Sequence, residues 1–80
     1  MTIKIVCEHL ASVPGPDGQR HHIAFNPTPE TVDAAYAWKD SGARHSIEVE
    51  DRAGLHERRA TAAVVKLVYD YGTLCITTDA

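Results

Sequence analysis

Apolar and polar residues alternate in two short segments near the start of the chain, TIKIVCEHL and RHHIAF. The apolar positions are Ile3, Ile5 and Cys7 in the first segment, and Ile23 and Phe25 in the second. A period of two predicts β-strands. Between them lies SVPGPDGQ, whose two prolines and two glycines predict a loop. We therefore expect a β-hairpin with a long loop.

The next segment, NPTPETVDAAYAWKDSG, carries the signals of a helix over residues 29–40. Thr28 suits the N-cap, Pro29 the first helical position, and Gly42 the left-handed residue that ends a helix. The inward face of this helix is expected to carry Val32, Ala35, Tyr36 and the stem of Lys39. A second interpretation stays open, in which AAYAW and ARHSIEV form two strands around a tight turn at KDSG. The alanines and the capping residues favour the helix.

Three further elements follow along the chain. RHSIEVE places Ile47 and Val49 on one side and Glu48 and Glu50 on the other, which predicts a strand with one acidic face. LHERRATAAVVKLVYDYG predicts a second helix ending at Gly72, because apolar residues recur at helical spacing. Those residues are Ala60, Ala63, Val64, Leu67, Val68 and Tyr71. TLCIT predicts a last strand.

The predicted order is therefore β-β-α-β-α-β within one α+β domain over residues 1–80. We expect a two-layer sandwich, in which a mainly antiparallel four-stranded sheet carries both helices on one face. The helix faces and the apolar strand positions would form a single core. The strand positions of that core are Ile3, Ile5, Cys7, Ile23, Phe25, Ile47, Val49, Leu74 and Ile76.

Charge and composition narrow the classes of function. The net charge is −3, and eight of the eleven acidic residues lie within residues 1–51. Direct nucleic-acid binding is not expected, because it requires a basic surface. No segment has the length and apolarity of a membrane span, and the start of the chain does not resemble a signal peptide, so we expect a cytoplasmic protein. Two cysteines are too few for a disulfide scaffold, and no cofactor is expected.

Candidate metal ligands flank the Pro/Gly-rich loop, with Cys7 and His9 before it and His21 and His22 after it. Thiolate and imidazole groups bind zinc and other transition metals, and a hairpin would place His9 opposite His21 or His22. The competing interpretation is four ordinary hairpin side chains, because the spacing matches no zinc motif. A catalytic Cys7–His9 pair is not expected either, since no glycine-rich turn follows the cysteine to stabilise an oxyanion.

Acidic residues and aromatic residues offer a candidate protein-binding surface. The proposed contacts are Glu48, Glu50, Asp51, Asp33 and Trp38. Glu30 and Asp40 belong to the same predicted helix as Asp33, and Tyr36 and Tyr69 lie near charged residues, as interface anchors often do. Such a face can dock on lysines and arginines of a partner. Two simpler interpretations stay open: a solvated acidic surface, and Trp38 as part of the core.

In its size, its acidity and its lack of a catalytic motif, the whole chain resembles the small phage-encoded inhibitors known as anti-CRISPR proteins. The resemblance implies a non-enzymatic inhibitor that binds a CRISPR effector subunit in the host cytoplasm and blocks nucleic-acid access, with acids in place of phosphates. Those inhibitors do not share one fold, so no residue roles carry over. Two other hypotheses are a small Cys/His metal-binding domain and a homo-oligomer formed through an open edge strand.

Overall fold

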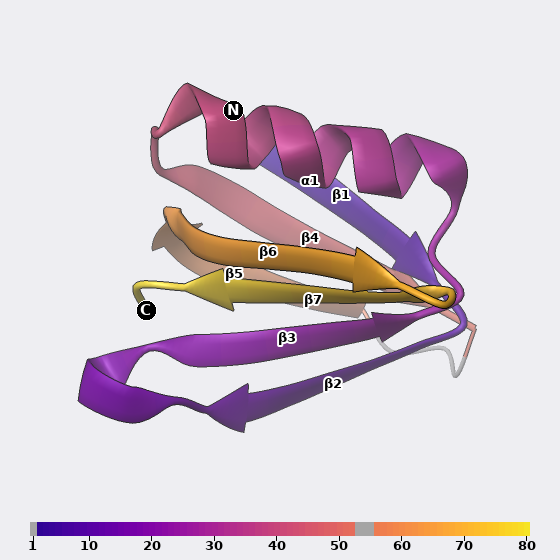
Figure 1. Ribbon diagram of the computed structural model, residues 1–80, viewed down its shortest axis with the longest axis horizontal. Helices are drawn as coiled ribbons and strands as arrows, with labels where there is room; N and C mark the ends of the chain where they lie inside the picture. The colour runs from indigo at the N-terminus through magenta and orange to yellow at the C-terminus, as the bar shows by residue number, and fades with distance from the viewer. Residues whose placement is uncertain (1, 53–55) are drawn as a thin grey trace.

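The computed structural model describes residues 2–52 and 56–80, without the side chains of residues 56–60 (Figure 1). The chain forms a small mixed α+β fold, as expected. In the described residues its elements are β1 (Thr2–Cys7), β2 (His9–Pro14), the short 3-10 helix η1 (Pro16–Gly18), β3 (Arg20–Phe25), α1 (Pro29–Ser41), β4 (His45–Asp51), β5 (His56–Ala62), β6 (Val64–Asp70) and β7 (Thr73–Thr78).

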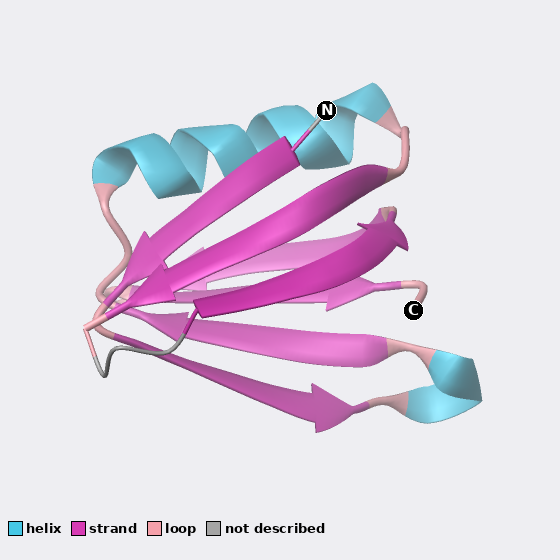
Figure 2. Cartoon of the chain, turned by 180° about the vertical axis from the view of Figure 1, so that it is seen from behind, coloured by secondary structure: helices cyan, strands magenta, loops and turns pink. Residues whose placement is uncertain are grey.

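The strands form two sheets rather than the single four-stranded sheet that we expected. One is three-stranded with the order β1-β4-β5, in which β1 and β4 are parallel. The other is four-stranded with the order β2-β3-β7-β6 and is antiparallel throughout. The three-stranded sheet lies behind the four-stranded sheet in the view of Figure 1. Helix α1 lies across the edges of both sheets, against β1 and β6 (Figures 1 and 2).

The chain passes directly from one sheet to the other at two places. Glu8 alone separates β1 from β2, and Ala63 alone separates β5 from β6. Each strand pair is therefore one extended segment that bends and changes sheets, as strands do at the corners of orthogonally packed sheets. These two crossings hold the sheets together covalently at their edges.

Hydrogen bonds to Glu8 fix the first crossing. The Glu8 N–H donates to the Phe25 carbonyl at 3.0 Å. The Glu8 carboxylate accepts from Asn26 Nδ2 at 2.6 Å and from Arg52 Nη1 at 3.2 Å. These bonds, chiefly the one from Asn26, lower the pKa of Glu8 because they favour its charged form.

Asp79, just after β7, fixes the second crossing in a similar way. The Ala63 N–H donates to Asp79 Oδ1 at 3.1 Å, and the Asp79 N–H donates to the Ala63 carbonyl at 3.1 Å. Arg44 pairs with the Asp79 carboxylate and also donates to the Thr61 carbonyl at 3.2 Å. The hydrogen bond from Ala63, followed by the contact with Arg44, lowers the pKa of Asp79.

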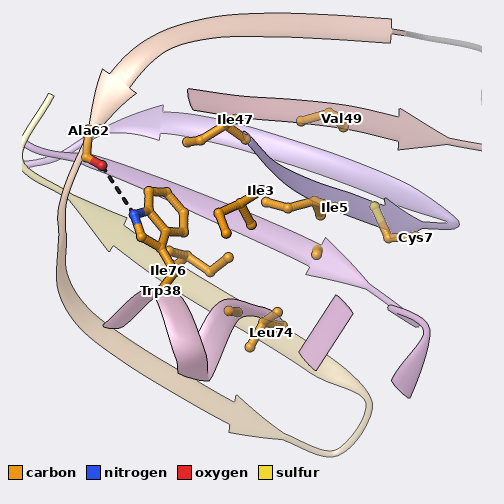
Figure 3. Packing of buried hydrophobic residues seen from close by; sticks show 11 residues of the cluster. Ile3, Ile5, Cys7, Trp38, Ile47, Val49, Ala62, Leu74 and Ile76 are labelled. Carbon is orange, nitrogen blue, oxygen red and sulfur yellow. Dashed lines mark hydrogen bonds between the residues drawn. The ribbon is translucent and has the colours of Figure 1, made fainter. Parts of the chain in front are cut away.

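Trp38 reaches from α1 into the core, where it lies beside Ala62, Ile3 and Ile76 (Figure 3). Its side chain is 1% exposed, and its Nε1 donates to the Ala62 carbonyl at 3.2 Å. The buried strand residues around it include the predicted ones of β1, β4 and β7, namely Ile3, Ile5, Cys7, Ile47, Val49, Leu74 and Ile76. The indole therefore connects α1 to the end of β5 as well as filling space.

Helix α1 begins and ends where the sequence predicts. The Thr28 hydroxyl accepts from the Thr31 N–H, Pro29 opens the helix, and Gly42 ends it at φ 64°. Its buried face is different from the predicted one, because it carries Thr31, Ala35 and Trp38. Thr31 accounts for part of the shift, since its hydroxyl accepts from the Val6 N–H at 2.9 Å and bonds the Val6 carbonyl at 3.2 Å. As a result, Tyr36 and Lys39 face outward, and Val32 is only partly buried.

The prediction of a second helix is wrong. Its residues 56–62 and 64–70 form β5 and β6, while position 55 lies outside the described residues. The β-branched residues Val64, Val65 and Val68 favour an extended chain, and pairing with β4 and β7 outweighs the helix propensity of the alanines. The helical spacing combines residues from both sides of β6, because Leu67 packs against the core while Val68 is 46% exposed on the other side of the sheet.

Two predictions about the first hairpin are also wrong. β3 turns His22 and Ala24 inward, while Phe25 is exposed and Ile23 only partly buried, because Ala24 pairs with the buried Leu74. The loop is shorter than expected, since β2 continues to Pro14. A one-residue change in register moves a whole set of side chains to the other face.

We predict that Trp38→Ala lowers the free energy of unfolding by about 3–5 kcal/mol, because it leaves a large cavity and an unpaired carbonyl. Trp38→Phe retains most of the packing and should cost less. Urea titrations followed by circular dichroism measure both. Tyr36→Ala, on the exposed side of the same helix, is the matched control and should change stability by no more than about 1 kcal/mol. Equal losses for Trp38→Ala and Tyr36→Ala would contradict the assignment of Trp38 to the core.

We predict an acid-dependent loss of stability that originates at the two crossings. The folded pKa values of Glu8 and Asp79 lie below the ordinary values of 4.5 and 3.8. The two ionised carboxylates therefore stabilise the folded state fully above the ordinary pKa values, and this stabilisation is lost as pH falls through their lower pKa values in the folded protein. In urea unfolding measured from neutral to acidic pH, the free energy of unfolding should fall less steeply for Glu8→Gln and for Asp79→Asn than for the wild type. A loss of the same steepness in all three proteins would contradict this explanation.

Candidate functional site

The outward side of α1 combines acidic residues with an exposed tyrosine. Glu30, Asp33, Tyr36 and Asp40 are all exposed, and we call them the helix face. Their spacing of three or four residues places them along one side of the helix. Tyr36 is 41% exposed and lies between the acids along the helix. Because Thr31 and Trp38 hold the opposite side of α1 in the core, this face is directed to solvent.

A shallow apolar hollow adjoins the helix face at the start of α1. It measures about 220 Å³ and is lined by Pro27, Pro29, Val32, Asp33 and Tyr69. Tyr69 belongs to β6, whose last residues lie at the same end of the molecule as the first turn of α1 (Figure 1). Asp33 therefore borders an apolar surface that includes Tyr69. Aromatic residues bordered by a polar rim are typical of protein-binding surfaces.

The acids of β4 are arranged differently from the predicted patch. Asp51 is buried at the end of the strand, so it is not part of an exposed surface. Glu50 pairs with Lys4 Nζ at 2.9 Å, and Glu48 lies in register with the same lysine. None of the three acids lacks an interaction partner. Lys4 therefore offsets part of the charge of this strand, and all three acids have interaction partners within the fold.

The remaining predicted contacts divide between the core and the helix face. Trp38 is buried in the core, so the simpler interpretation of this residue is confirmed and its predicted role as a surface contact is wrong. Asp33 is exposed on the helix face, beside the hollow. The sequence singled out Tyr69 because it is offset from the apolar stripe of the second predicted helix, but its position beside Asp33 follows only from the packing of α1 against β6.

The four predicted metal ligands do not come together. β2 pairs with β3 so that His9 lies opposite Phe25, with ring centroids 6.0 Å apart. His22 points inward, where Nδ1 bonds Ser12 Oγ at 3.0 Å and Nε2 bonds Thr78 Oγ1 at 3.1 Å. His21 bonds Thr77 on the outside of the sheet, and Cys7 belongs to the other sheet. Among the described residues, no group of three or more Cys, His, Asp or Glu side chains is placed to hold a metal ion.

Cys7 has the environment of a core thiol. It is 3% exposed, and burial raises its pKa, with a further contribution from Asp51. A raised pKa keeps the thiol protonated and weakens it as a nucleophile. His9 lies beyond the bend at Glu8 in the other sheet, so the two side chains do not share a face.

Comparisons with known proteins give no family for this chain: no family model, no curated protein and no solved structure matches it. In the part of the chain that the structure describes, no helix has the length and apolarity needed to cross a membrane. The functional argument therefore depends on the geometry of the molecule itself.

We predict that the two cysteines differ in reactivity. In dilute native protein, Cys75 should react with a thiol reagent about tenfold or more faster than Cys7, because Cys75 is partly exposed and Cys7 is buried with a raised pKa. Ellman's reagent measures the two phases. Cys75→Ser should remove the fast phase and Cys7→Ser the slow phase, whereas equal rates for both thiols would contradict the burial of Cys7.

Proposed function

We propose that this chain is a non-enzymatic protein-binding module that docks the helix face on a basic surface of a partner protein. The observation that carries the proposal is the exposure of Glu30, Asp33 and Asp40 around Tyr36, beside the hollow lined by Tyr69. The acids attract lysines and arginines, and the tyrosines supply apolar contact area at low entropic cost.

The fold supports this function by holding the helix rigidly. Thr28 and Gly42 cap α1, and Trp38 anchors its inner side, so little conformational entropy is lost when a partner binds. A helix that is already ordered presents its outer residues at fixed spacing. Tyr36 is the expected centre of the interface, since anchors of binding energy are most often aromatic residues surrounded by polar ones.

The partner is expected to carry a basic groove or patch. The resemblance to anti-CRISPR proteins suggests one such surface, the nucleic-acid path of a CRISPR effector subunit. There the acids of the helix face would take the place of phosphates. Glu48 and Glu50 lie outside the helix face, so in this proposal they contribute only to long-range attraction of the partner.

An array of purified proteins from the organism that carries the gene, with CRISPR effector subunits included, tests the proposal. The triple variant Asp33→Asn/Tyr36→Ala/Asp40→Asn removes two charges and one aromatic side chain from the helix face. We expect the wild type to bind a basic protein on the array, and the triple variant to bind it about 30-fold more weakly, because loss of one aromatic anchor alone costs ~2 kcal/mol.

A charge-matched variant provides the control. Glu48→Gln/Glu50→Gln also removes two charges, but from the outer side of the three-stranded sheet, and should retain the affinity to within about threefold. Circular dichroism checks that both variants stay folded. The proposal is overturned if no arrayed protein binds, or if the two variants weaken binding equally.

A further inference from the structure

The outer side of the four-stranded sheet carries a continuous row of apolar residues. Ala11 pairs with Ile23, Ile23 with Cys75, and Cys75 with Val68, so one residue from each strand contributes to the row. Directly paired residues of antiparallel strands lie on the same side of the sheet. We call this side the sheet face, and these four residues its central row.

No other element of the described chain covers the sheet face. It is the side turned toward the viewer in Figure 1, where α1 lies above the edge of the sheet and the three-stranded sheet lies behind it. Val68 is 46% exposed, and Phe25, beside the central row, is 40% exposed. Antiparallel sheets with one wet face normally alternate apolar and polar residues. The strand β3 departs from that pattern, because Ala24 is buried within the fold while Ile23 and Phe25 lie on the sheet face.

Charged groups flank the central row at one edge. On β6, Lys66 lies two residues before Val68, and Asp70 lies two residues after it. Lys66 pairs with Thr77 and Asp70 with Thr73, which places both on the sheet face, and both are exposed. Apart from histidines, Lys66 and Asp70 are the charged residues that the strand register places on the sheet face in the described part of the chain. A positive and a negative group thus lie at equal distances from the row.

This arrangement is complementary to itself. A two-fold rotation about the central row lays each strand over its own copy in the opposite direction. The rotation exchanges the residues on the two sides of the row, so Lys66 meets Asp70 of the second copy and Asp70 meets its Lys66. Two ion pairs form at once, and the apolar residues of the row lie against their own copies. A two-fold interface requires exactly such a self-complementary patch.

We infer that the chain forms a homodimer through the sheet face, with the two-fold axis along the row Ala11–Ile23–Cys75–Val68. The two sheets pack about 10 Å apart, as in a β-sandwich. This interface uses a different surface from the helix face and does not depend on the proposed partner. It buries the apolar row that the single chain leaves in water, which matters for a chain of 80 residues with a small core.

The geometry also fixes how the two helices are placed. The rotation keeps β6 over β6, and α1 packs beside β6 in each copy. Both copies of α1 therefore lie along the same edge of the dimer. A partner with two basic sites would meet two helix faces together, and its apparent affinity would rise through a higher effective concentration.

Charge reversal at β6 tests the dimer and its axis together. Lys66→Asp places two acids opposite each other at both ends of the interface, and Asp70→Lys places two lysines there. In sedimentation equilibrium, each single variant should dimerise about tenfold or more weakly than the wild type, whose monomer has a mass of 8.7 kDa. The double variant Lys66→Asp/Asp70→Lys should recover the dimer, and an equimolar mixture of the two single variants should form a heterodimer.

The reactivity of Cys75 supplies a second measurement. Its labelling by Ellman's reagent should slow as the protein concentration rises, and Lys66→Asp should restore the fast labelling at high concentration. Substitutions at the exposed positions 66 and 70 should leave the core intact, and circular dichroism checks that each variant is folded. A wild type that sediments as a monomer up to millimolar concentration overturns the inference. A dimer that is unaffected by the single reversals overturns it as well.

Discussion

The whole fold depends on two extended segments that each belong to both sheets. At Glu8 and at Ala63 the chain leaves one sheet and enters the other without an intervening loop. A bend of this kind breaks the regular pairing of backbone groups, which must then find other partners. At the first bend the partners are other backbone groups: the Glu8 N–H donates to the Phe25 carbonyl, and the Arg52 N–H lies within hydrogen-bond distance of the Cys7 and Glu8 carbonyls. At the second bend the Asp79 carboxylate accepts from the Ala63 N–H. A carboxylate lies at each corner, but only that of Asp79 accepts from the backbone; that of Glu8 is bonded by the side chains of Asn26 and Arg52.

Helix α1 derives its position from these crossings. It lies across the edges of β1 and β6. β1 leads into the crossing at Glu8, and β6 leads out of the crossing at Ala63. Trp38 donates to Ala62, the residue before the second crossing, while Thr31 bonds both the N–H and the carbonyl of Val6, near the first. Because both ends of the inner helix surface are attached in this way, the acidic and aromatic outer surface has a defined orientation.

Much of the local structure could be predicted from the sequence, and the failures have identifiable causes. The helix boundaries follow from Thr28 and Gly42, whose capping roles are local. The strands β1, β4 and β7 follow from alternation. Residues 56–70 carry apolar side chains on both sides of their strands, which places apolar residues at helical spacing in the sequence, and only pairing with β4 and β7 resolves that ambiguity. The same limitation applies to the site: Asp33 and Tyr36 are adjacent along the helix, whereas Tyr69 joins them only through the topology.

The position of β7 has a consequence for how the molecule is made. It is the last strand along the chain, yet it lies between β3 and β6 in the middle of the four-stranded sheet. During synthesis on the ribosome, the β2–β3 hairpin can form early, but β3 has no partner on its other side until residues 73–78 emerge. The edge of β3 that receives β7 therefore stays unpaired until those residues have been made, and it is open to wrong pairing or to a chaperone in the meantime. Such long-range closure is slow, so the pairing of residues 73–78 with β3 controls when the four-stranded sheet is complete.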